Sequence, residues 1–146
     1  MIRPRRVTMV ALIACLAAAA MPASAVAVIP CDENQPPLID GYTNPPEITE
    51  NHHKYTAVQA IILVADDDSG PVVIELIGAV SSEPDSGLGK GDKPNDIVQV
   101  GLYDFLVRAE LGRDSSSRSY TFTYRATDGC GVARETSVTV TVLARR

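Results

Sequence analysis

The sequence predicts an all-β protein, an antiparallel β-sandwich of about seven strands. Short segments rich in Val, Ile and Tyr are separated by clusters of Gly, Pro, Asp and Ser. The last two segments alternate strictly between apolar and polar residues, which is typical of strands buried on one face. After the first 25 residues, no stretch has the apolar periodicity of a helix.

The first 25 residues have the layout of a secretory signal peptide. Met1–Arg6 holds three arginines and no acid, an apolar run follows over Val7–Met21, and Ala23 and Ala25 form a small-residue cleavage pattern. The run is shorter than the about 20 apolar residues that a spanning helix needs. We therefore expect cleavage near Ala25 and a secreted, periplasmic or cell-surface protein.

A lipid anchor is the alternative for this segment. Leu12–Cys15 resembles a bacterial lipobox, in which the cysteine is lipidated and begins the mature chain. A polar tether usually follows such a cysteine, whereas here the apolar residues continue to Met21. Simple secretion fits better, and a lipid on Cys15 would change the location of the protein but not its fold.

Removal of the first 25 of 146 residues leaves 121, the size of a single domain. Three of the 13 basic residues lie in the removed segment, which leaves 10 basic against 18 acidic residues and a net charge of −8. Nucleic acid is excluded as a partner because such proteins carry a basic patch. An unknown protein or a cell-surface glycan remains as the partner.

Two cysteines remain in the mature chain, Cys31 and Cys130. In an oxidising compartment an isolated pair predicts a disulfide, and two unpaired buried thiols are the alternative. A bridge across 99 residues would stabilise the fold by at most about 4 to 5 kcal/mol on the chain-entropy model.

The strands are expected in the following order. Residues 26–46 hold five of the ten prolines and predict an extended lead-in with at most a short edge strand at Leu38–Ile39, before a sandwich domain over 47–146. Tyr55–Ala65 is apolar on both faces and predicts a central strand, and Val72–Val80 predicts the next one. Ser81–Asp96 has no periodicity and predicts a long loop.

Residues 97–109 predict two short strands or one strand bent at Gly101. The alternating segments 120–126 and 135–142 close the domain, joined by a turn whose Gly129 and Gly131 can take positive φ. Together these strands and turns indicate an immunoglobulin-like arrangement.

The closing segments, YTFTYRATDGCG from Tyr120 and VTVTV from Val138, resemble those of hyalin-repeat-like and related Ig-like domains of secreted bacterial proteins. The resemblance covers about residues 45–142. It extends through these upstream positions: Pro45-Pro46, Asn51–Lys54, Ser82–Asp85, Gly91-Asp92, Asn95-Asp96 and Val107–Glu110. It implies an Ig-like accessory module with no activity of its own.

The long loop is a candidate calcium site, because its glycines could bend several carboxylates toward the 6 to 8 oxygen ligands that the ion takes. Lys90 and Lys93 argue against it, the spacing is not that of an EF-hand, and a solvated turn is the alternative. Asp66–Asp68 form a second, weaker candidate. The four predicted ligands are Glu83, Asp85, Asp92 and Asp96.

The other reactive side chains do not form a recognisable catalytic motif. His52 and His53 are adjacent, so in a strand they would point to opposite faces, and no HExxH motif or third ligand accompanies them. There is no GxSxG motif and no tryptophan. We therefore expect an exported non-enzymatic module for binding, adhesion or structural support. The alternatives are an envelope protein lipidated on Cys15 and a small hydrolase that uses the Glu83–Asp96 loop.

Overall fold

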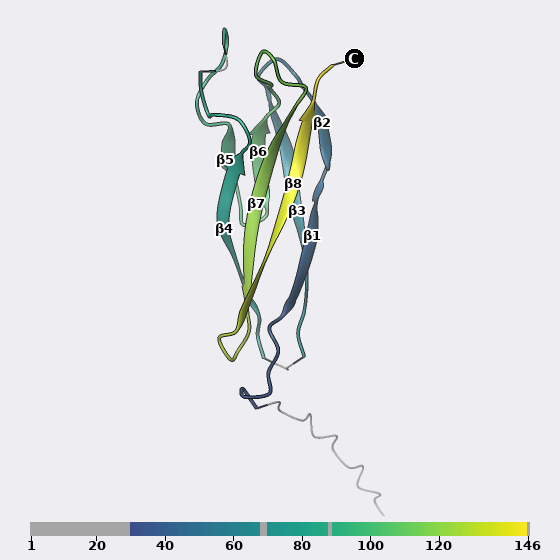
Figure 1. The fold of residues 1–146 in the computed structure, drawn as a ribbon, viewed down its shortest axis with the longest axis vertical. Coiled ribbons are helices and arrows are strands. Elements are labelled where there is room, and N and C mark those ends of the chain that lie inside the picture. Colours follow the sequence, from purple (N-terminus) through teal and green to yellow (C-terminus); the bar gives the residue numbers. More distant parts are fainter. Residues whose placement is uncertain (1–29, 68–69, 88, 146) are drawn as a thin grey trace, which may run out of the picture.

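The computed structural model describes residues 30–67, 70–87 and 89–145, so the predicted signal peptide and Cys15 lie outside the described residues. Eight strands form two four-stranded sheets that pack face to face (Figure 1). The described residues contain no helix with the length and apolar character needed to cross a membrane. The predicted all-β sandwich is confirmed.

The strand order is that of an immunoglobulin-like domain. The first sheet has the order β1 (Leu38–Asn44), β3 (Tyr55–Ala65), β6 (Asp104–Arg108), β5 (Ile97–Gln99). The second sheet has the order β2 (Glu47–Thr49), β8 (Ala133–Leu143), β7 (Ser117–Thr127), β4 (Val73–Ser81). If β1 and β2 are counted as one divided strand, these are the A-B-E-D and A-G-F-C sheets of the immunoglobulin fold.

The first strand is longer than the sequence suggested. The expectation of a short edge strand at Leu38–Ile39 is wrong, because β1 pairs with β3 over seven residues, from Leu38–Ala65 to Asn44–Gln59. Prolines stand on both sides of β1 but not within it, so every residue of the strand keeps its N–H. Beyond Pro45-Pro46 the chain crosses to the second sheet, where β2 runs parallel to β8.

The core lies between the sheets and is built by the alternating strands. Tyr120, Phe122 and Tyr124 of β7 are fully buried, and Phe122 stacks on Phe105 of β6 with ring centroids 3.9 Å apart. β3 pairs with a strand on each side, as expected of a central strand. Its apolar outer face is not covered by the second sheet, and Leu63 there is 58% exposed.

A disulfide closes one end of the sandwich. Cys31, in the segment before β1, is bonded to Cys130 in the turn between β7 and β8, with the two Cα atoms 5.5 Å apart. Beside it, Asn34 Nδ2 donates a hydrogen bond of 2.7 Å to Asp128 Oδ2. The lead-in is therefore fastened to the last hairpin, as the cysteine count predicted.

Replacement of both cysteines tests the contribution of this bridge. We expect Cys31→Ser/Cys130→Ser to lower the free energy of unfolding by about 2 to 5 kcal/mol, because the unfolded chain regains the entropy of a loop of 99 residues. Urea denaturation of the variant and the parent measures the difference. Two free thiols in the unfolded, unreduced parent would contradict the bridge itself.

Candidate functional site

The β4–β5 and β6–β7 connections and the turn before β3 lie at one end of the sandwich, opposite the β7–β8 turn that carries Cys130 (Figure 1). Charged side chains from these connections contact one another there. Three of them are acidic groups with oxygen atoms within 4.8 Å of one another: Asp92, Asp96 and Glu110. Two arginines, Arg108 of β6 and Arg118 of β7, lie among them.

Asp96 is the centre of this group and is 1% exposed. Its Oδ1 accepts a hydrogen bond of 3.2 Å from Arg108 Nε, and its Oδ2 accepts one from Arg118 Nη2. A buried carboxylate is tolerated only when it is paired and hydrogen-bonded. The two arginines provide that pairing.

Glu110 is buried to the same degree and shares Arg118. Its Oε1 accepts a hydrogen bond of 3.1 Å from Arg118 Nη1, and its Oε2 lies 2.6 Å from His53 Nδ1. Burial raises the pKa of Glu110, the hydrogen bond with His53 opposes that rise, and the neighbouring Asp96 adds to it, so the net shift is upward. The imidazole and the guanidinium together hold the carboxylate.

The arginines also hold the loop backbone. Arg118 has no exposed side-chain surface, and it donates to Ser81 Oγ at 2.7 Å and to the Pro84 carbonyl at 3.2 Å. Arg108 donates to the His53 carbonyl at 2.9 Å. The Tyr120 hydroxyl donates to the Arg108 carbonyl at 2.7 Å, a tie of the tyrosine-corner kind found in immunoglobulin-like domains.

The predicted calcium ligands divide between different tasks. Asp85 accepts hydrogen bonds from the Asp96 and Asn95 amides at 2.7 and 3.0 Å, which lower the pKa of its carboxyl. Glu83 Oε2 accepts one of 2.9 Å from the Gly112 amide. Asp92 and Asp96 come together, but with Glu110, which the sequence reading did not include among the ligands.

Glu110 had a recognisable signal that loop composition does not reveal. It lies beyond the loop, two residues after Arg108 in a segment that is otherwise apolar. Alternate residues of an extended segment point to the same face, and Glu110 Oε2 lies 4.0 Å from Arg108 Nε. Of the second acidic candidate, Asp68 lies outside the described residues, whereas Asp66 and Asp67 follow β3 and line a hollow with Gln35 and Arg134.

The histidine pair forms a turn and not a strand. His52 and His53 have φ of 49° and 61°, and the Lys54 amide donates to the Asn51 carbonyl at 3.0 Å. Two positive φ values belong to a type I′ turn, where Asn and Gly are the usual residues. The two side chains diverge, because His53 contacts Glu110 whereas His52 Nε2 lies 3.0 Å from Arg145 Nη1.

No known family model matches the chain. No curated protein matches it either. Among solved structures it is similar to PcdhgB3 EC1-4, a protocadherin, at 20% identity and a TM-score of 0.38, over 76% of this chain and 25% of that one. The chain thus spans about a quarter of that protein's length. The strand order defines the class, an immunoglobulin-like β-sandwich domain, and the hyalin-repeat resemblance stays a prediction.

Two arginines of the same strand test the energetic role of the network. We expect Arg118→Met to destabilise the domain by about 3 to 5 kcal/mol, because two buried carboxylates would lose their partner. Arg125→Met is the matched control, since Arg125 forms an exposed pair with Glu135 and its loss should cost about 1 kcal/mol or less. If urea denaturation gave the two variants equal free energies of unfolding, the buried ion network would not stabilise the domain more than an exposed ion pair does.

Proposed function

We propose that the chain is an exported, non-enzymatic Ig-like module for binding, adhesion or structural support at the cell exterior. The observation that carries the proposal is the exposed apolar outer face of the first sheet, where Leu38, Tyr42 and Leu63 are 57 to 63% exposed. Groups of exposed apolar side chains on a folded domain mark interaction surfaces. The Cys31–Cys130 disulfide adds support for an oxidising compartment.

The arrangement of the charged groups supports a scaffold more than a hydrolase. A general acid or base must come within hydrogen-bond distance of its substrate. Asp96 and Glu110 are each 1% exposed, and their oxygen atoms are occupied by Arg108, Arg118 and His53. The arrangement therefore gives Asp96 and Glu110 a structural role, in which they bind the arginines and His53.

Mass spectrometry of the chain recovered from its native host tests export. We expect a mature chain that begins at Val26, is found outside the cytoplasm, and is lighter by two hydrogens than its reduced form. A diacylglyceryl group on Cys15 would instead establish the lipid-anchored alternative, and an uncleaved cytoplasmic chain would overturn the proposal.

Turnover of esters, glycosides or peptides by the purified domain, lost in Asp92→Ala or Asp96→Ala, would establish the hydrolase.

Calcium binding is a second candidate, favoured by the grouping of Asp92, Asp96 and Glu110. Calcium takes 6 to 8 oxygen ligands, and here it would compete with Arg108 and Arg118 for the same carboxylate oxygens. The arginines thus supply the positive charge that the carboxylates need. The calcium hypothesis requires that the ion add stability beyond theirs.

Thermal melting of the mature domain in calcium and in excess chelator tests whether calcium stabilises the domain in addition to the arginines. We expect the same midpoint in both, because the arginines already neutralise the buried acids. A calcium site would instead stabilise the folded domain by RT ln(1 + [L]/Kd), about 2.7 kcal/mol at a free calcium concentration a hundredfold above Kd. The midpoint would rise with that stabilisation. That increase should then disappear in Asp92→Asn, which leaves the Asp96 and Glu110 pairs with arginine in place.

A further inference from the structure

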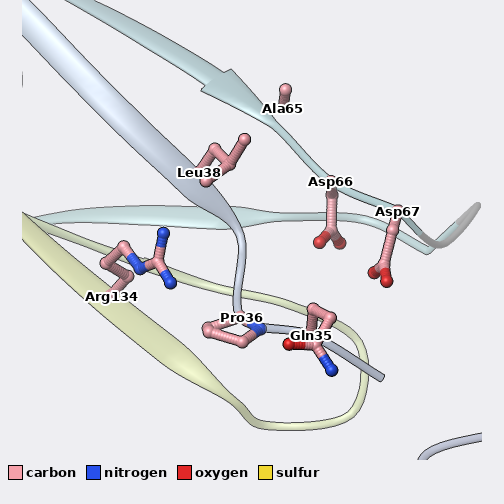
Figure 2. Close-up of a pocket in the computed structure, with 7 residues that line it drawn as sticks. All are labelled: Gln35, Pro36, Leu38, Ala65, Asp66, Asp67 and Arg134. Carbon is pink, nitrogen blue, oxygen red and sulfur yellow. The ribbon is translucent and has the colours of Figure 1, made fainter. Parts of the chain in front are cut away.

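Resting on the proposed function, we propose that the outer face of β1 and β3 is a docking groove for an extended segment of a partner protein that presents both apolar and basic side chains to it. Two adjoining hollows of about 400 and about 370 Å³ lie there and share Leu38 and Ala65. The first hollow also reaches Arg134 of β8 and the segment before β1 (Figure 2).

The strand register makes the floor of the groove apolar. Leu38 lies opposite Ala65, Asp40 opposite Leu63, and Tyr42 opposite Ile61. Alternate residues of a strand point to the same face, so Leu38 and Tyr42 of β1, with Asp40 between them, share the outer face with Leu63 of β3, and the three apolar side chains form a zigzag row across the two strands. Their exposed fractions of 63, 58 and 57% leave this row open to a partner.

The same register favours an extended occupant. Outward side chains on β1 recur every second residue, at about 6.6 to 6.8 Å. A second extended segment lying along this face presents its own side chains at the same interval. On the face that the segment turns to the sheet, apolar side chains can then meet Leu38 and Leu63, and a basic side chain two residues from an apolar one can meet Asp40.

The edges of the groove are acidic. Asp40 lines one hollow and Asp66 and Asp67 line the other, and among the described residues that line the two hollows Arg134 is the one cation. Figure 2 shows the two aspartates at the end of β3 and Arg134 on β8 across the hollow. The carboxylate oxygens of Asp66 are buried, so the exposed acids Asp40 and Asp67 are the ones that complement a segment with lysine or arginine.

Charge also excludes the other occupants. A second copy would present the same acidic edges about a two-fold axis, and like charges placed face to face are costly. The mature domain after residue 25 carries 18 acids against 10 bases, which adds to that repulsion. A neutral glycan offers no charge to complement the aspartates.

Fluorescence anisotropy with three labelled heptapeptides tests the proposal. Each has leucine at positions 1 and 5, threonine at the even positions, and at positions 3 and 7 one polar residue, which is lysine, serine or glutamate, so that leucine and the polar residue share one face of the extended peptide. We expect the lysine peptide to bind the mature domain about tenfold or more tightly than the serine peptide, with affinity falling as salt rises. Leu63→Ser and the double variant Asp40→Asn/Asp67→Asn should each weaken the lysine peptide about tenfold or more.

Two control variants separate the groove from general attraction to an acidic protein. Val80→Ser removes an apolar side chain that is 60% exposed on β4 of the other sheet. Glu47→Gln/Asp114→Asn removes two exposed acids away from the groove. Both should bind the lysine peptide like the parent, and equal losses in control and groove variants would overturn the proposal.

The remaining outcomes are also decisive. Equal binding of the three peptides, or no binding of the lysine peptide, would refute a basic and apolar partner. A dimer seen by sedimentation velocity in the parent and lost in Leu63→Ser would assign the face to a second copy. If the lysine peptide fails to bind but the chain begins at Val26 and is found outside the cell, only the groove is refuted. If the chain is cytoplasmic, the proposed function is refuted whatever the peptides do.

Discussion

The buried guanidinium of Arg118 is the interaction on which the loop end of this domain depends. It lies on β7, between the sheets, and binds Asp96 at the end of the β4–β5 connection and Glu110 just after β6. It also binds the backbone at Pro84. A buried charge must keep its partners close, since losing one leaves an uncompensated ion. The β4–β5 connection and the segment after β6 are thereby held to one strand.

The two ends of the sandwich are held by different means. A covalent bridge joins the lead-in to the last hairpin at one end, the ion network orders the loops at the other, and stacked aromatic rings such as Phe105 and Phe122 fill the space between. None of these devices uses the outer face of β1 and β3. That face carries exposed apolar side chains, and Asp40 and Asp67 line the hollows on it.

The predictions from sequence were right where a local pattern decides the structure, and they were wrong or incomplete where partners distant in sequence decide it. Period-two alternation located β7 and β8, because each apolar residue there faces the core directly. β1 was underestimated, because its proline-rich flanks hide a strand stabilised by pairing with β3. Glu110 was missed as a member of the acidic group, because its partners His53 and Arg118 come from other elements.

The sequence by itself determined the sandwich class and the strand alternation, which follow from periodicity and turn residues, and it predicted the Cys31–Cys130 pairing from the two cysteines outside the predicted signal peptide. Only the tertiary structure decided which carboxylates meet. The loop acids divide between backbone amides and arginines because the strand order brings β6 and β7 to the same end of the sandwich. Likewise, Leu38 and Leu63 share an exposed face only through the register of β1 and β3, which no local pattern encodes.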